Sequence, residues 1–180
     1  MIGKNNTYLV MQAFFDRPTH RFQLRELSRE TGISLPSVRE HVRALERQGL
    51  VNRVDEGVYG SFVASAEDSM YRAYKVCDMV TRIHESGLTG FLEKELSFPG
   101  ALVLFGSCSE GTDTEASDID ILVVGGEKKL SMKPFERKLR RRISLHFMDK
   151  KELSNAGKNS PEFMNNIMNG IVLYGYLKVF

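Results

Sequence analysis

The sequence has little that would suit a secreted or membrane-bound protein. It contains no apolar run of about eighteen residues, so a membrane-spanning helix is not expected. Cysteine occurs twice, at Cys77 and Cys108, which argues against a disulfide framework or a zinc site. The N-terminal residues lack the apolar core and the small-residue cleavage site of a signal peptide. These absences predict a protein of the reducing cytoplasm with no membrane partner.

The sequence also lacks a strong excess of charge of one sign. The formal net charge is +2, from 25 lysine and arginine residues against 23 aspartate and glutamate residues. A field of one sign over the whole protein is therefore absent, and any nucleic-acid contact must come from a local patch. The hydrophobic content of 42% is typical of a globular chain.

The order of the patterns predicts an α+β fold in three regions. Residues 1–65 suggest a small helical domain that ends in a hairpin, and residues 66–96 suggest connecting helices. Residues 97–180 alternate between strand-like and helix-like segments, which predicts a mixed sheet flanked by helices.

The first region has a tight turn between two amphipathic helices. Gly32 ends the earlier helix, since a left-handed position favours glycine. Val38, Val42 and Leu45 then form an apolar stripe at i, i+4 and i+7, and Gly49 closes the second helix. Two short apolar segments on either side of "DEG" predict a hairpin.

On these features, residues 25–65 resemble the winged helix-turn-helix domains of many prokaryotic transcription regulators. The resemblance implies that the helix over 35–48 enters the major groove of double-stranded DNA. The DNA-binding candidates are Ser37, Arg39 and Arg43 on that helix and Arg53 on the hairpin. Winged domains often read two half-sites, so a homodimer is expected. The alternative is a protein-interaction module in which these arginines form a solvated face.

The second distinctive stretch is "FGSCSEGTDTEASDIDILVV", residues 105–124. Side chains alternate along a strand, so Asp118 and Asp120 lie on one face and Ile119 and Ile121 on the other. Two neighbouring carboxylates repel each other, and a divalent cation removes that conflict. Mg²⁺ is the natural choice, since it is usually held by one or two carboxylates plus substrate phosphates. The alternative is a capping or turn role for Asp118.

A glycine and a serine precede the acidic pair. Gly106 ends the preceding apolar strand, and its lack of a Cβ lets a ligand approach the backbone. Ser107 would open a short helix, whose N–H groups and hydroxyl favour phosphate. A phosphate cradle beside paired carboxylates is the arrangement that metal-assisted phosphoryl or nucleotidyl transfer needs.

Residues 101–176 resemble the minimal nucleotidyltransferases of the DNA polymerase β superfamily. The motif positions are Gly106, Ser107, Gly111, Ser117, Asp118 and Asp120. The resemblance implies that the two aspartates, which are also the catalytic candidates, hold Mg²⁺. It also implies that a nucleoside triphosphate binds at Gly106 and Ser107, with ATP as the first candidate. The implied reaction transfers a nucleoside monophosphate to a hydroxyl of a protein or small molecule and releases pyrophosphate.

The sequence departs from that family at two places. The family places a third carboxylate on a neighbouring strand, and the matching position here is His146 or Ser144. His146 is a candidate metal ligand or base, or an ordinary strand histidine. Glu110 and Asp113 add negative charge to the motif loop, which disfavours a triphosphate. The alternative function is therefore a transcriptional regulator whose transferase-like domain only binds a nucleotide or a partner.

The basic run over residues 136–142 remains open on sequence alone. A solvated helix face is the favoured interpretation, because runs of charge usually have that role. Contact with a triphosphate, an acidic partner or nucleic acid is the alternative.

Overall fold

The computed structural model describes residues 5–54 and 60–178, and it shows the predicted α+β class. The chain divides into two units, residues 1–75 and 76–180, each with its own internal contacts. The division falls inside helix α4 (Ser69–Ser86). Residues 66–96, predicted as connecting helices, form α4 and α5 (Leu88–Glu95).

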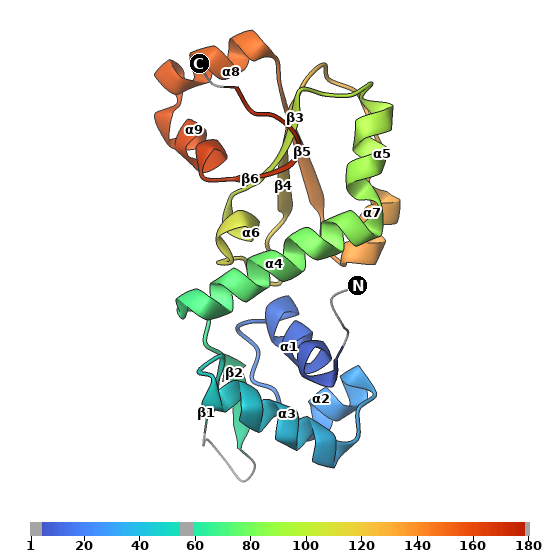
Figure 1. The fold of residues 1–180 in the computed structure, drawn as a ribbon, viewed down its shortest axis with the longest axis vertical. Coiled ribbons are helices and arrows are strands. Elements are labelled where there is room, and N and C mark those ends of the chain that lie inside the picture. The colour runs from blue at the N-terminus through green and yellow to red at the C-terminus, as the bar shows by residue number, and fades with distance from the viewer. Residues whose placement is uncertain (1–4, 55–59, 179–180) are drawn as a thin grey trace. The chain divides into compact units, whose positions relative to one another are not determined.

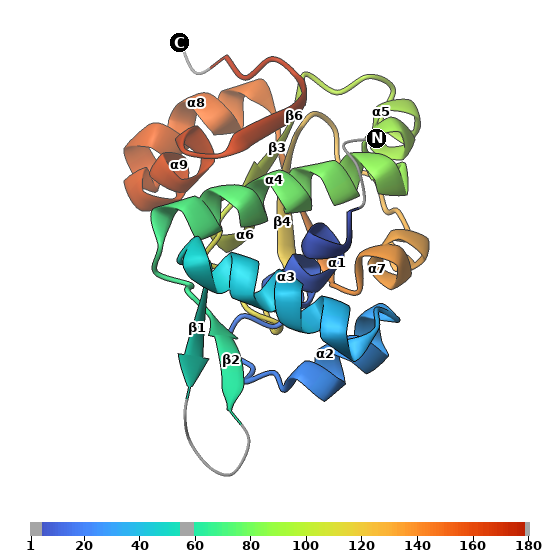
Figure 2. The same ribbon diagram turned by 60° about the horizontal axis from the view of Figure 1, so that its bottom comes forward.

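The first unit consists of helices and a hairpin (Figure 2). Its elements before α4 are α1 (Asn6–Asp16), α2 (Leu24–Thr31), α3 (Leu35–Arg47), β1 (Val51–Val54) and β2 (Ser61–Ala64). Gly32 ends α2 with a φ of 71°, a left-handed value that favours glycine. The two strands pair antiparallel, as the hairpin prediction requires. The "DEG" turn between them lies outside the described residues.

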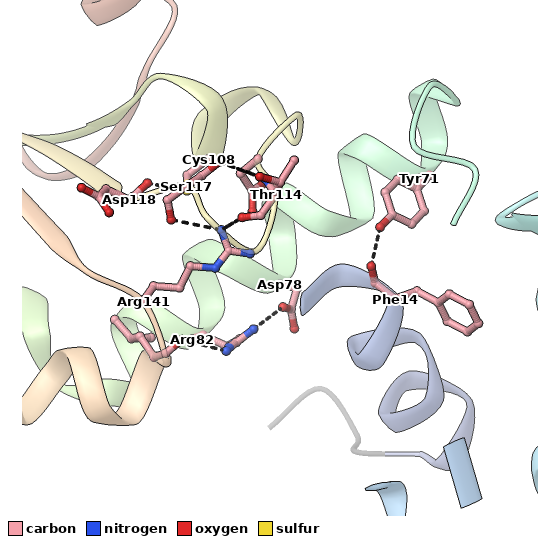
Figure 3. A network of polar contacts seen from close by, with 11 residues as sticks. Phe14, Tyr71, Asp78, Arg82, Cys108, Thr114, Ser117, Asp118 and Arg141 are labelled. Atoms are coloured by element: carbon pink, nitrogen blue, oxygen red, sulfur yellow. Dashed lines mark hydrogen bonds and ion pairs between the residues drawn. The ribbon is translucent and has the colours of Figure 1, made fainter. Parts of the chain in front are cut away.

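The core of this unit explains the apolar stripe of α3. Val38, Val42 and Leu45 are buried in one cluster with side chains of α1 and α2. The Tyr71 hydroxyl, from the first turn of α4, donates a hydrogen bond of 2.8 Å to the Phe14 carbonyl (Figure 3). The start of α4 is thereby attached to α1.

The second unit contains a four-stranded mixed sheet with strand order β5-β4-β3-β6 (Figure 1). Strands β4 and β5 are parallel, whereas β3 is antiparallel to both β4 and β6. The elements after α5 are β3 (Ala101–Phe105), α6 (Ser107–Glu110), β4 (Ile119–Val124), α7 (Lys133–Leu139), β5 (Ile143–Met148), α8 (Lys150–Asn159), α9 (Pro161–Met168) and β6 (Ile171–Gly175).

Helices cover both faces of this sheet. Leu122 and Val124 pack in a cluster with residues of α8 and α9. Ile119, Ile121 and Val123 point the other way and pack with residues of α5, α7 and the second half of α4. Because β3 and β4 are buried on both faces, their sequences are almost continuously apolar. A polar side chain on either strand therefore needs a separate explanation.

Within residues 5–54 and 60–178, no helix combines the length and the apolar character needed to cross a membrane. Neither cysteine forms a disulfide within the described residues; Cys77 is exposed and Cys108 is buried.

Candidate functional site

Asp118 and Asp120 lie at the end of the sheet where β4 and β5 begin. Strand β4 begins at Ile119, so Asp118 immediately precedes it. Ile119 is fully buried on the opposite face, which leaves the two aspartates on the face covered by α8 and α9. Both are partly exposed, and the Asp120 side chain is 31% exposed. The carboxylates are therefore accessible to a ligand at an otherwise apolar face.

The neighbouring strand brings two polar side chains to the same carboxylates. The parallel register places Ser144 opposite Asp120 and His146 opposite Leu122. The Ser144 hydroxyl donates to Asp118 Oδ2 at 3.5 Å, and His146 Nε2 lies 3.1 Å from Asp120 Oδ1. Both positions considered for a third carboxylate therefore face the pair, one beside each aspartate.

The imidazole of His146 is held by aromatic rings as well as by Asp120. Its ring centroid lies 5.1 Å from that of Phe105 in an edge-on arrangement and 6.3 Å from that of Phe163. Its side chain is 41% exposed. The ring is thus positioned by packing on one side while solvent reaches the other. This arrangement orients the Asp120 carboxylate through its hydrogen bond.

The glycine–serine turn lies beside the acidic pair because β3 is antiparallel to β4. Phe105, the last residue of β3, pairs with Asp120, and Gly106 follows it. Gly106 has φ 69° and ψ −156°, a conformation that is essentially restricted to glycine. A Cβ at this position would lie 3.5 Å from Asp120 Oδ2. Ser107 then begins α6, so the structure brings the predicted nucleotide-binding residues next to the aspartates.

A buried arginine that the sequence analysis missed holds the loop before Asp118. The side chains of Arg141 and Asp113 are 5% and 1% exposed and form an ion pair of 2.8 Å. Arg141 Nη1 also donates to the carbonyls of Thr114 and Ser117, at 2.6 and 3.4 Å (Figure 3). A single side chain therefore connects several points of the loop between Gly111 and Asp118.

This network corrects two expectations. Arg141 belongs to the run interpreted as a solvated face, but it is buried. The charge of Asp113 is compensated by Arg141, so it does not add uncompensated acid beside a phosphate. Glu110 is exposed, which turns its charge toward solvent. The charge pattern of the run could not single out Arg141, because its partners lie 24 to 28 residues earlier in the chain.

The donor set fits a cation that also takes ligands from its substrate. Among the residues that the structure describes, no group of three or more His, Cys, Asp or Glu side chains is placed to hold a metal ion. Asp118 and Asp120 offer two carboxylates on one face. Such a set suits Mg²⁺, which keeps several waters and binds through one or two carboxylates plus phosphate oxygens.

A separate groove lies on the first unit. It has a volume of about 470 Å³ and lies between the start of α2, helix α3 and the hairpin. Its lining includes four arginines, Arg25, Arg39, Arg43 and Arg53. Three of these were predicted DNA contacts, and Arg25, at the second position of α2, was missed. Arg25 lines the groove because α2 packs against α3, a contact that the local pattern around Arg25 does not show.

Ser37 lies apart from these arginines. Its hydroxyl is 3.1 Å from His41 Nε2, and His41 Nδ1 is 2.9 Å from the Thr7 hydroxyl of α1. Ser37 is half-buried and does not line the groove. The structure thus brings the predicted arginines together and gives Ser37 an internal partner.

Two family models match the chain. The model described as Polymerase beta, Nucleotidyltransferase matches residues 88–177, and the one described as Winged helix-turn-helix DNA-binding matches residues 23–52. The first match covers half of the 180 residues. Both resemblances and their order along the chain are confirmed. No curated protein and no solved structure matches the chain.

Proposed function

Because the chain belongs to the polymerase beta nucleotidyltransferase family and carries a winged helix-turn-helix, we propose that it is a DNA-binding enzyme that transfers nucleoside monophosphates. The donor is a nucleoside triphosphate, with ATP as the first candidate, and the acceptor is a hydroxyl of a protein or small molecule. The observation that carries the proposal is the shared face of Asp118 and Asp120 beside the Gly106 turn.

Mg²⁺ is the cofactor of this proposal, with Asp118 and Asp120 as its protein ligands. When bound, it supplies positive charge that stabilises the charge developing on the phosphoryl oxygens. Gly106 lies close to Asp120, since a Cβ added to it would sit 3.5 Å from Asp120 Oδ2, so phosphate oxygens bound at its backbone could share the cation that this carboxylate would hold.

The reaction forms one bond and breaks one. The acceptor oxygen bonds to the α-phosphorus while the bond from that phosphorus to the bridging oxygen breaks, and pyrophosphate leaves. The backbone at Gly106 and the Ser107 hydroxyl would bind the triphosphate. His146, whose Nε2 is hydrogen-bonded to Asp120 Oδ1, would take the proton of the acceptor hydroxyl at its Nδ1.

A second candidate function is a regulator in which this unit binds a nucleotide without turnover. It is favoured by Ser144 and His146, which occupy the two positions considered for the third carboxylate. This candidate keeps the same nucleotide site and differs only in the absence of transfer.

The decisive experiment follows the two ends of the triphosphate separately. Full-length protein is incubated with ATP labelled at the α- or the γ-phosphate, with Mg²⁺ or with a chelator, and with protein and small-molecule hydroxyl acceptors. Label transferred from the α-position only, with γ-label leaving in pyrophosphate, supports the enzyme. ATP binding with neither label transferred supports the regulator. Transfer of γ-label, or no ATP binding, overturns both.

The groove of the first unit gives a separate prediction for DNA binding. Replacing Arg39 and Arg43 with glutamine is expected to weaken binding to duplex DNA at least tenfold and to reduce the salt slope of binding by about 2, since each lost phosphate contact removes about one unit. Fluorescence anisotropy across salt concentrations measures both. The control is Arg29→Gln, Arg47→Gln, which removes two exposed arginines outside the groove. Equal losses in both variants would contradict a role for the groove.

A homodimer and a cytoplasmic location remain predictions from the sequence. Sedimentation of the protein with and without duplex DNA would measure the first.

A further inference from the structure

A cluster of cations lies on the second unit, outside the site described above. It surrounds a shallow hollow of about 350 Å³, lined by Lys133, Glu136, Arg137, Arg140, Arg141 and Arg142. Arg141 forms the ion pair with Asp113 described above. The other four cations, Lys133, Arg137, Arg140 and Arg142, are exposed, and within residues 5–54 and 60–178 none of them forms an ion pair. We call these four residues the α7 basic surface.

The arrangement of these cations is locally unfavourable. Lys133 and Arg137 are separated by four residues on α7, where like charges repel. Arg140 has a φ of 55°, a left-handed value that disfavours side chains with a Cβ and usually carries glycine or asparagine. Glu136 adds one negative charge to the hollow, and its Oε1 accepts a hydrogen bond from the Ile143 backbone, so four exposed cations face a single carboxylate that is directed to the backbone. Residues that depart from such charge and backbone preferences, without a local gain in stability, are characteristic of functional surfaces.

The α7 basic surface reaches the end of the sheet that holds the aspartates. Helix α7 leads directly into β5 (Figure 1). The Arg142 carbonyl accepts a hydrogen bond of 2.8 Å from the Ile119 backbone, and Ile119 lies between Asp118 and Asp120. The α7 basic surface therefore lies near the same end of the sheet as the aspartates, although α7 itself packs against the opposite face.

We propose that the α7 basic surface binds the phosphodiester backbone of a nucleic acid. Three of its four members are arginines, whose planar donors match phosphate oxygens in pairs. Every side chain that lines the hollow is charged, so it lacks the apolar or aromatic anchors that protein interfaces use. The match of residues 23–52 to a DNA-binding family makes nucleic acid a ligand already expected for this chain. The inference goes beyond nucleotide transfer and does not depend on it.

The test separates this surface from the groove of the first unit. All proteins are full length and carry Arg39→Gln and Arg43→Gln, which remove two groove arginines. The test protein adds Lys133→Gln, Arg137→Gln and Arg140→Gln, and the control adds Lys94→Gln, Lys129→Gln and Lys151→Gln, three exposed lysines of the same unit. Arg142 is left unchanged because its backbone holds the strand beside the aspartates.

Binding of labelled single-stranded and duplex oligonucleotides of random sequence is measured by anisotropy at several salt concentrations, without nucleotide or divalent cation. The test protein is expected to bind at least tenfold more weakly than its parent, with a salt slope smaller by about 3. The control is expected to keep most of the parent's affinity.

Three results would overturn the proposal: equal losses of affinity in the test and control proteins, no oligonucleotide binding by the parent, or competition by poly-glutamate equal to that by unlabelled oligonucleotide. The last result would indicate an acidic protein partner instead. Asp118 and Asp120 are intact in every protein of this experiment. A negative result for oligonucleotide binding therefore does not bear on the proposed transfer reaction, which the labelled-ATP experiment tests.

Discussion

Replacing Arg141 with methionine is expected to lower the free energy of unfolding of the second unit by about 3–5 kcal/mol, the usual effect of removing one partner of a buried ion pair. Asp113 would remain with its side chain 1% exposed and would lose the guanidinium of Arg141. The carbonyls of Thr114 and Ser117 would lose the donor that connects them. The loop before Asp118 would then move, and divalent-cation binding at the site would fall with it.

Hydrogen exchange read by mass spectrometry suits this prediction, because two units need not unfold together and the method reports on residues 112–118 directly. Arg137→Met is the matched control. Arg137 is exposed, and exposed substitutions usually change stability by less than about 0.5 kcal/mol. Unchanged protection of the loop in Arg141→Met would contradict the structural role of the ion pair.

The double variant Asp113→Leu, Arg141→Met separates stability from positioning. Removing both charges avoids an uncompensated buried carboxylate, so much of the lost stability is expected to return. The loop carbonyls still lack their donor, so divalent-cation binding is expected to remain weaker than in the wild type. Full recovery of binding, measured by calorimetry with Mn²⁺ as the probe, would show that Arg141 contributes only to stability.

Replacing Asp118 and Asp120 with asparagine is expected to lower the rate of α-label transfer by more than about 100-fold. Losses of 10–100-fold are typical for residues that only support metal ligands, and direct ligands should exceed them. Asparagine keeps the shape of aspartate but removes the charge that would hold a divalent cation. Initial rates at saturating ATP measure the effect.

Two comparisons make that result specific. Glu110→Gln removes an exposed carboxylate from the same loop and is expected to leave the rate within about twofold of the wild type. Duplex DNA binding of the double variant is expected to stay unchanged, because neither aspartate belongs to the groove of the first unit or to the α7 basic surface. A double variant that transfers label at the wild-type rate would exclude the aspartates from the reaction.

Short-range patterns predicted most of the site. Asp118 and Asp120 share a face because side chains alternate along a strand, and the apolar neighbours of the pair show which face is buried. Gly106 ends the preceding strand, so an antiparallel pairing with β4 suffices to bring it beside Asp120. Each of these inferences needs only a few residues of context, which is why the sequence carried them.

Pairings between distant segments decided what the sequence left open. Ser144 and His146 share a face by alternation, but how near each lies to the aspartates depends on the β4–β5 register. Arg141 is buried because its partners lie in a loop 24 to 28 residues earlier in the chain. Ser37 turns toward His41, whose other ring nitrogen contacts α1. None of these contacts leaves a local periodic signal.

The direction of β4 has a practical consequence for labelling. The strand starts beside Asp118 and leaves the sheet at Val124, so the segment after Gly125 emerges at the far end from the aspartates. Gly126 is exposed, and a Cβ added there would meet no atom within 4 Å. An epitope or fluorescent tag inserted after this glycine would thus report on the second unit while leaving its chemistry undisturbed.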